Sequence, residues 1–190
     1  MISNRKKEDG GRLFAVRFLV FSENPERKGE AAVLSLLKPD YRFDKITDIK
    51  AEDLKKVGAK LLLLDADNTL SFHGSQTPFP GVPEWISEIK KSGFELVIIS
   101  NNSERRIKPF AENLGLPFVY KSAKPLPKGF KKAAENFGIS PKETAVIGDQ
   151  LFTDVLGGKI FGSKVFLTEP LGPETDFFIK VKRKIEKFIR

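Results

Sequence analysis

The sequence predicts an α/β fold built on a doubly wound parallel sheet. Two patterns indicate it: short runs that are apolar at consecutive positions, as in strands covered on both faces, and helical segments between these runs. The expected strands are residues 61–64, 94–99, 116–119, 145–147 and 165–167. Strands that alternate with helices pair in parallel, because each helix returns the chain to the start of the next strand.

Start and stop residues place the helices between the strands. Pro83 suits a first helical turn and Gly93 follows the end of that helix, over residues 82–92. Ser103 can cap the next helix and Gly115 ends it, while Pro109 predicts a break or a new start inside it. The remaining expected helices are residues 51–57, 128–137 and 154–161.

Charge and length divide the chain into three parts. The 190 residues carry a formal net charge of +8, but residues 40–176 hold equal numbers of basic and acidic side chains, so the excess lies at the two ends. We expect an N-terminal extension over residues 1–40, partly disordered, with a strand or helix over residues 13–37. One domain is expected over residues 41–176 and a basic amphipathic helix over residues 177–190. A neutral body predicts no nucleic-acid groove.

Composition excludes several kinds of site. The chain has no cysteine, which excludes disulfides and thiolate zinc sites, and a single histidine, His73, which excludes multi-histidine metal sites. His73 is expected in a surface loop, with a substrate contact as the alternative. The apolar run after Arg12 contains Arg17, is too short to span a bilayer and lacks a cleavage signature. The cytoplasm is therefore the expected compartment.

Two carboxylates follow the first predicted strand, in the stretch LLLLDADNTL. Asp65 and Asp67 are two residues apart, so their side chains lie on one side of an extended chain at the carboxyl end of the strand. Carboxylates that converge there repel each other unless a cation or a proton intervenes, and Mg²⁺ prefers oxygen ligands. The alternative is ordinary turn and helix-cap chemistry, in which Asp, Asn and Thr are common.

Later strands also end in polar residues. These residues are Ser100 and Asn101, then Lys124, then Asp149 and Asp154. Because parallel strands end at the same edge of a sheet, we expect a hydroxyl, a lysine and a second acidic pair around Asp65. Such a set suits a phosphate group beside a metal ion. Solvated loop residues are the alternative for Ser100 and Lys124, and a helix cap is the alternative for Asp154.

In this order the motifs resemble those of the haloacid dehalogenase-like (HAD) phosphohydrolases. The resemblance covers residues 61–167, through LDADNTL, SNNSERRIKPFAENLG, KP and GDQLFTDVLGG. These stretches are most similar to YqeG-type phosphatases, whose relatives include mitochondrial phosphatidylglycerophosphate phosphatases. The resemblance implies a HAD-like catalytic domain without a cap.

The resemblance also implies a role for each motif residue. Asp65 would be the nucleophile that forms an aspartyl-phosphate, and Asp67 would be the general acid and base. The implied phosphate-binding residues are Ser100, Asn101 and Lys124. The implied Mg²⁺ ligands are Asp65, Asp67 through its backbone carbonyl, Asp149, and Asp154 either directly or behind another ligand.

The spacing of the motifs bears on the substrate. The gap from Asp67 to Ser100 and the gap from Ser100 to Lys124 leave no room for an inserted cap domain. An open site suits a substrate that is large or held in a surface. Residues 177–190 could lie on an anionic membrane or pack on the sheet. Together with the family resemblance, these features predict a phosphomonoester substrate on a lipid head group, phosphatidylglycerophosphate, with peripheral membrane contact.

Three alternatives stay open at this stage. The substrate could be a soluble phosphoester or a phosphoprotein. A phosphorylation-dependent switch would also place Asp, Ser or Thr, and Lys at strand ends, although the Asp-x-Asp-x-Thr order differs from that of signal-receiver domains. A binding protein could retain the site without turnover.

Overall fold

The computed structural model describes residues 35–171. The predictions for residues 1–34 and 172–190, including the C-terminal helix, lie outside the described residues. Of the segment expected over residues 13–37, only the last three residues are described.

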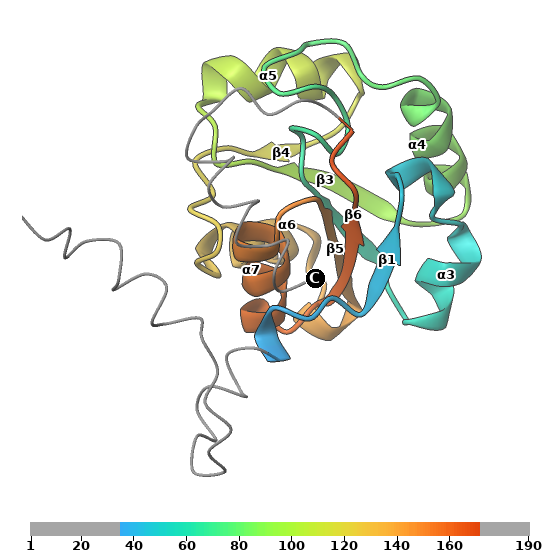
Figure 1. Cartoon of the computed structure of the whole chain (residues 1–190), viewed down its shortest axis with the longest axis vertical. Coiled ribbons are helices and arrows are strands. Elements are labelled where there is room, and N and C mark those ends of the chain that lie inside the picture. The colour runs from blue at the N-terminus through green and yellow to red at the C-terminus, as the bar shows by residue number, and fades with distance from the viewer. Residues whose placement is uncertain (1–34, 172–190) are drawn as a thin grey trace, which may run out of the picture. The chain divides into compact units, whose positions relative to one another are not determined.

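A six-stranded parallel sheet with the order β1-β6-β5-β2-β3-β4 forms the centre of the described chain (Figure 1). Its strands are β1 (Tyr41–Phe43), β2 (Leu61–Leu64), β3 (Glu95–Ile99), β4 (Phe118–Val119), β5 (Thr144–Gly148) and β6 (Lys164–Thr168). The predicted α/β class with a doubly wound parallel sheet is confirmed. Each of the five predicted strands overlaps one of β2 to β6.

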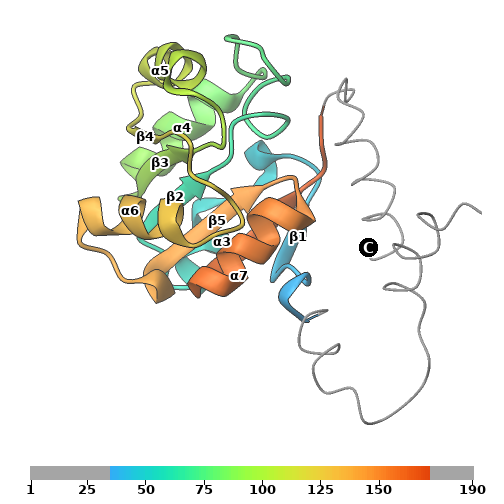
Figure 2. The same cartoon turned by 90° about the vertical axis from the view of Figure 1, so that its left-hand side faces the viewer.

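Helices cover both faces of the sheet. They are α3 (Ala51–Lys56), α4 (Val82–Lys91), α5 (Glu104–Asn113), α6 (Lys128–Phe137) and α7 (Leu156–Phe161). Buried side chains of α3, α4 and α5 share one core with Leu62 and Leu64, whereas α6 packs in a second core with Leu61 and Leu63. Figure 2 shows α6 and α7 on the same side of the sheet. The all-leucine strand β2 therefore serves two cores, because alternate side chains of a strand point to opposite faces.

The edge strand β1 was not predicted from the sequence. It has only three residues, too few to show a period. Tertiary contacts place it: the Asp40 carboxylate accepts a hydrogen bond of 2.8 Å from the backbone N–H of Val165, and the Tyr41 ring stacks on Phe166 at 4.8 Å. Cross-strand aromatic stacking of this kind stabilises a short pairing that local sequence cannot specify.

The break expected at Pro109 does not occur, because α5 runs through this residue from Glu104 to Asn113. Proline removes the hydrogen bond that the carbonyl of Arg105 would otherwise accept. Ile107 and Phe110, on either side of the proline, are fully buried against the sheet. Burial of such side chains, worth about 1.5–3 kcal/mol each, outweighs the loss of one intrahelical hydrogen bond.

Within residues 35–171, none of the helices has the length and apolar character needed to cross a membrane.

Replacing Trp85 with phenylalanine tests how α4 is fixed to the preceding segment. The buried Trp85 indole donates a 2.8 Å hydrogen bond from Nε1 to the carbonyl oxygen of Ile49. Because Trp85→Phe leaves that carbonyl without its donor, we expect the free energy of unfolding to fall by about 1–3 kcal/mol in urea titrations. Ser87→Ala, at an exposed position of the same helix, should change it by less than about 0.5 kcal/mol. Equal effects of the two substitutions would contradict this role for the indole.

Candidate active site

The site lies where the strand order reverses. The chain builds β2, β3 and β4 outward in one direction and then returns to place β5 on the other side of β2. Leu64 is in register with Ile147 of β5 and Ile98 of β3, and the Asp65 N–H donates to the carbonyl of Ile147 at 2.9 Å. Such a reversal leaves a crevice at the carboxyl ends of the strands, where open α/β sheets bind ligands.

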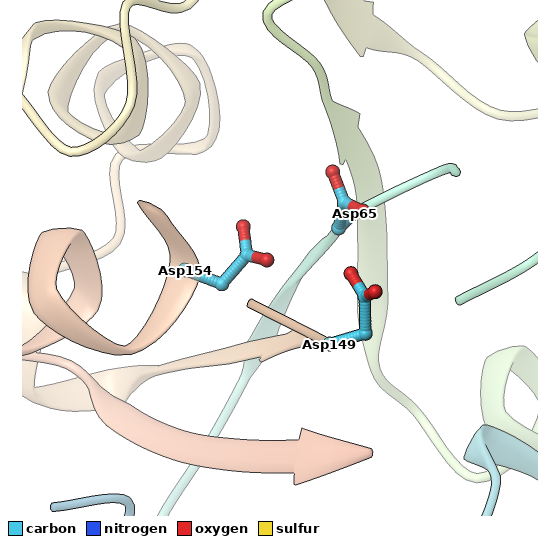
Figure 3. Close-up of side chains that lie close together, drawn as sticks. All are labelled: Asp65, Asp149 and Asp154. Carbon is cyan, nitrogen blue, oxygen red and sulfur yellow. The ribbon is translucent and has the colours of Figure 1, made fainter. Parts of the chain in front are cut away.

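Three carboxylates from two strand ends and one helical turn converge in this crevice. Figure 3 shows the side chains of Asp65, Asp149 and Asp154 close together. All three residues are buried, and one carboxylate oxygen of each lies within 4.8 Å of the others. The approach depends on Gly148, because a Cβ there would lie 2.5 Å from Asp154 Oδ2. The structure thus brings these three residues of the predicted site together.

The turn that carries Asp154 differs from the predicted helix over residues 154–161. A π-helical turn, Leu151–Val155, precedes α7 and places Asp154 inside it. Single π-turns of this kind often occur at functional sites. The Asp154 carboxylate accepts a hydrogen bond of 3.1 Å from the backbone N–H of Gln150, as a cap would. Its other oxygen faces the site, so one side chain holds the turn and joins the acidic group.

The ammonium of Lys124 lies between two of these carboxylates. It donates to Asp65 Oδ1 and to Asp154 Oδ1, the latter at 2.7 Å. Lys124 is buried, so the structure does not show it as a solvated loop residue. Although burial lowers the pKa of Lys124, the charges of Asp154 and Asp65 outweigh that effect and raise it above its ordinary value. The lysine therefore stays positively charged beside the acidic group.

The Asp65 carboxyl responds to the same surroundings in the opposite sense. Burial raises its pKa from 3.8 to about 7, and the charges of Asp154 and Asp67 add to the rise against the lowering effect of Lys124. Near neutral pH, a proton therefore competes with a cation for the Asp65 carboxylate. A cation between the carboxylates would relieve their repulsion.

Ser100 and Asn101 follow β3 and bring the lysine loop to the site. Ser100 is buried, and its backbone N–H donates to Val119. Asn101 Oδ1 accepts hydrogen bonds from the Ser122 hydroxyl at 2.8 Å and the Lys124 N–H at 2.7 Å, while its amide donates to the Lys124 carbonyl at 3.0 Å. The Asn101 side chain thus holds the loop that carries Lys124. Its predicted contact with phosphate would come from its backbone.

The Asp67 carboxylate lies apart from the acidic group and has its own donors. Its Oδ1 accepts from Arg106 Nη2 at 2.9 Å and from the Gly74 N–H at 2.9 Å, and its Oδ2 accepts from the Asn102 amide. His73 Nδ1 lies 3.7 Å from Oδ1 on a side chain that is 40% exposed, which agrees with its expected place in a loop. A metal contact from Asp67 would therefore come from its backbone carbonyl, as the resemblance implies.

Asn102 and Arg106 are the functional candidates that the sequence analysis missed. The Asn102 side-chain amide donates a hydrogen bond to Asp67 Oδ2. Arg106 lies in the first turn of α5, directly after the strand end that carries Ser100. Its position in the sequence could have indicated Arg106. A basic residue in the first turn of a helix that starts at the edge of the site can reach into the site.

The donor set of the acidic group fits Mg²⁺. Mg²⁺ binds oxygen ligands, commonly one or two carboxylates together with water or phosphate oxygens. Asp65, Asp149 and Asp154 supply buried carboxylate oxygens within 4.8 Å of one another, and Lys124 donates to two of these three carboxylates.

A comparison with protein families identifies the family of this chain. The family model described as haloacid dehalogenase-like hydrolase matches residues 23–162. This chain belongs to the haloacid dehalogenase-like hydrolase family. The match includes Asp65, Ser100, Lys124 and Asp149, so the sequence resemblance to HAD proteins is confirmed.

Three proteins named as phosphatases or a probable phosphatase are similar to this chain. The Bacillus subtilis protein named "Probable phosphatase YqeG" is 40% identical over 151 residues, which are 80% of this chain and 88% of that protein. The chloroplastic and mitochondrial phosphatidylglycerophosphate phosphatase 1 of Arabidopsis thaliana is 27% identical over 71% of this chain and 42% of that protein. The mitochondrial phosphatidylglycerophosphatase of Saccharomyces cerevisiae is 28% identical over 82% of this chain and 90% of that protein. Together with the family match, these similarities show that this chain is a HAD phosphatase.

Solved structures share the fold at low sequence identity. A 4-nitrophenylphosphatase from Thermotoga maritima superposes with a TM-score of 0.53 at 14% identity, over 65% of this chain and 90% of that chain. The cobalt-bound deoxy-D-mannose-octulosonate 8-phosphate phosphatase from Haemophilus influenzae gives 0.50 at 14% identity, over 67% of this chain and 77% of that chain. These similarities support the α/β sheet and its flanking helices.

Proposed function

We propose that this HAD phosphatase is a Mg²⁺-dependent phosphomonoester hydrolase that works through an aspartyl-phosphate on Asp65. The observation that carries the proposal is the place of Asp65 at the reversal of strand order, where its carboxylate lies within 4.8 Å of those of Asp149 and Asp154 and accepts a hydrogen bond from the Lys124 ammonium. A carboxylate beside positive charge at such an edge is positioned to meet a phosphoryl group. Splitting hydrolysis into two displacements replaces one difficult step by two easier ones.

The reaction follows from the roles of the two aspartates. An Asp65 oxygen attacks phosphorus, the bond from phosphorus to the ester oxygen breaks, and Asp67 gives its proton to the leaving alkoxide. In the second step Asp67 takes a proton from water, the water oxygen attacks the phosphorus of the aspartyl-phosphate, and Asp65 is released with inorganic phosphate. General acid and base assistance of this kind contributes about 10²–10⁴-fold to a rate.

Other groups bind the phosphoryl oxygens while they transfer. Lys124, which donates to Asp65 Oδ1, would bind these oxygens together with the Ser100 hydroxyl and the backbone at Asn101, which follow the β3 strand end. Mg²⁺ held by Asp65, Asp149, Asp154 and the Asp67 carbonyl would supply positive charge for the phosphoryl oxygens. Within the described residues, the connections from β2 to β3 and from β3 to β4 contain only α4 and α5, which supports the capless prediction.

For the substrate we propose phosphatidylglycerophosphate, a phosphomonoester on a lipid head group. Two relatives carry this activity in their names and align with 71% and 82% of this chain. The absence of an inserted cap in residues 35–171 supports access by a large substrate. The proposal includes peripheral contact of the basic residues 177–190 with an anionic membrane. A soluble phosphoester or a phosphoprotein is the alternative that the same site would accept.

Removing the nucleophile tests covalent catalysis. Asp65→Asn and Asp67→Asn should each lower phosphate release from phenyl phosphate, whose leaving group needs a proton, by about 10³-fold or more, because each removes a group that acts in bond breaking. Circular dichroism should show that both variants keep the fold. Asp48→Asn, at a position whose side chain is 41% exposed, is the matched control and should keep full turnover. Retained turnover in Asp65→Asn would contradict the aspartyl-phosphate route, and inactivity of the wild-type protein would favour a switch or a binding protein.

The pKa of Asp65 predicts how metal binding depends on pH. Its folded pKa of about 7 exceeds its ordinary 3.8, so without metal this group makes the fold less stable as pH rises through that interval. Mg²⁺ needs the ionised carboxylate, which a proton competes for at low pH. Saturating Mg²⁺ should therefore raise the Tm by about 5 °C or more near pH 8, and by clearly less near pH 6. Calorimetry with Asp48→Asn as control measures this, and a shift that does not vary with pH would contradict it.

A phosphate-release screen tests the substrate. We expect turnover of phosphatidylglycerophosphate in mixed micelles to exceed turnover of soluble phosphomonoesters and phosphopeptides in kcat/KM, because the leaving group is large and held in a surface. Co-sedimentation with anionic and neutral vesicles, with and without residues 177–190, measures membrane contact in parallel. Activity confined to water-soluble compounds, with no vesicle binding, would remove the lipid substrate and leave the phosphatase assignment intact.

A further inference from the structure

We infer that Arg106 is a positioning residue that orients the Asp67 carboxyl toward the leaving group. The inference rests on the proposed function of Asp67 as general acid. Its structural basis is the ion pair between Arg106 Nη2 and Asp67 Oδ1 at 2.9 Å, in which the side chains are only 19% and 11% exposed. An ion pair held this far from solvent has a more defined geometry than a surface pair.

Arg106 ties together three pieces of chain around that carboxyl. The same Nη2 atom donates to the carbonyl of Ser75 at 3.0 Å, and Gln76 Nε2 donates back to the Arg106 carbonyl at 3.1 Å. The loop after Asp67 is thereby fastened to the first turn of α5. A planar guanidinium can bridge two acceptors in a fixed arrangement, which a lysine ammonium on a flexible stem cannot reproduce.

The remaining donors to Asp67 complete the orientation. The Gly74 N–H shares Oδ1 with Arg106, and the Asn102 amide holds Oδ2. With a donor on each oxygen, both the position and the plane of the carboxyl are determined. A proton donor must lie within hydrogen-bonding reach of the ester oxygen, and a displacement of about 1 Å can cost 10²-fold in rate.

This role predicts a loss of activity that depends on the leaving group. A strongly acidic phenol leaves without help, so hydrolysis of 4-nitrophenyl phosphate needs little assistance from Asp67. Phenol is a weaker acid, and phenyl phosphate therefore depends more on proton donation. The ratio kcat/KM covers only the steps up to formation of the aspartyl-phosphate, so it isolates the step in which the leaving group departs.

The experiment compares Arg106→Gln with Arg105→Gln on these two substrates. Arg105 is the neighbouring, exposed arginine of the same helix, so both substitutions remove one positive charge. We expect Arg106→Gln to lower kcat/KM by about 10- to 100-fold for phenyl phosphate and by less than about threefold for 4-nitrophenyl phosphate. Arg105→Gln should change both by less than about twofold. An equal loss on the two substrates, or no loss, would overturn the inference.

Two further variants separate the causes. Arg106→Lys retains the positive charge and an aliphatic stem. It should therefore lower kcat/KM for phenyl phosphate more than for 4-nitrophenyl phosphate, but by less than Arg106→Gln does. If Arg106→Gln fails to fold, Arg106→Lys replaces it as the test. An unselective loss in the folded variant would overturn the inference. Asp67→Asn should impair phenyl phosphate more strongly than either. If Asp67→Asn shows this loss while Arg106→Gln behaves like Arg105→Gln, the role of Arg106 is wrong and the acid role of Asp67 stands. If Asp67→Asn leaves the turnover of both substrates unchanged, the acid role of Asp67 is wrong, and the inference about Arg106 is wrong with it.

Discussion

The structure depends on the balance between three buried carboxylates and one buried ammonium. Asp65, Asp149 and Asp154 repel one another within 4.8 Å, and Lys124 offsets part of that repulsion. Burial makes the balance costly, because low-dielectric surroundings penalise every unpaired charge. This burial raises the pKa of Asp65. A cation bound among these carboxylates would relieve their repulsion.

Several local features exist to hold this charge arrangement. The parallel register of β2 with β5 places the two strand ends side by side. Gly148 leaves the space that Asp154 fills, and the π-turn directs Asp154 into the crevice. The Asn101 side chain fixes the loop that delivers Lys124. Each of these backbone or packing features helps to keep the charged groups buried at a defined separation.

The site has two sides with different chemistry. One side holds the charged cluster around Asp65, where the phosphoryl group is proposed to bind. The other side holds Asp67, whose partners Arg106, Asn102 and Gly74 come from a different helix and a different loop. In the proposed mechanism, this division separates Asp65, which would bond to phosphorus, from Asp67, which would transfer the proton. Membership of the HAD family agrees with this arrangement. The proposed lipid substrate is supported by two relatives that are named as phosphatidylglycerophosphate phosphatases.

The sequence by itself determined the parallel sheet, because buried strands and capped helices leave local patterns. It also predicted Asp65, Lys124 and Asp149 at one edge, because parallel strands end there, and the structure brings these three residues together. It did not determine β1, the continuity of α5 through Pro109, or the π-turn at Asp154. These depend on stacking against Phe166, on burial of Ile107 and Phe110, and on a carboxylate reaching a backbone N–H. Only the tertiary structure decided that Arg106 pairs with Asp67 and that the Asn101 side chain serves the lysine loop. Side-chain partners distant in sequence have no local pattern, since their choice depends on the packing that brings them together.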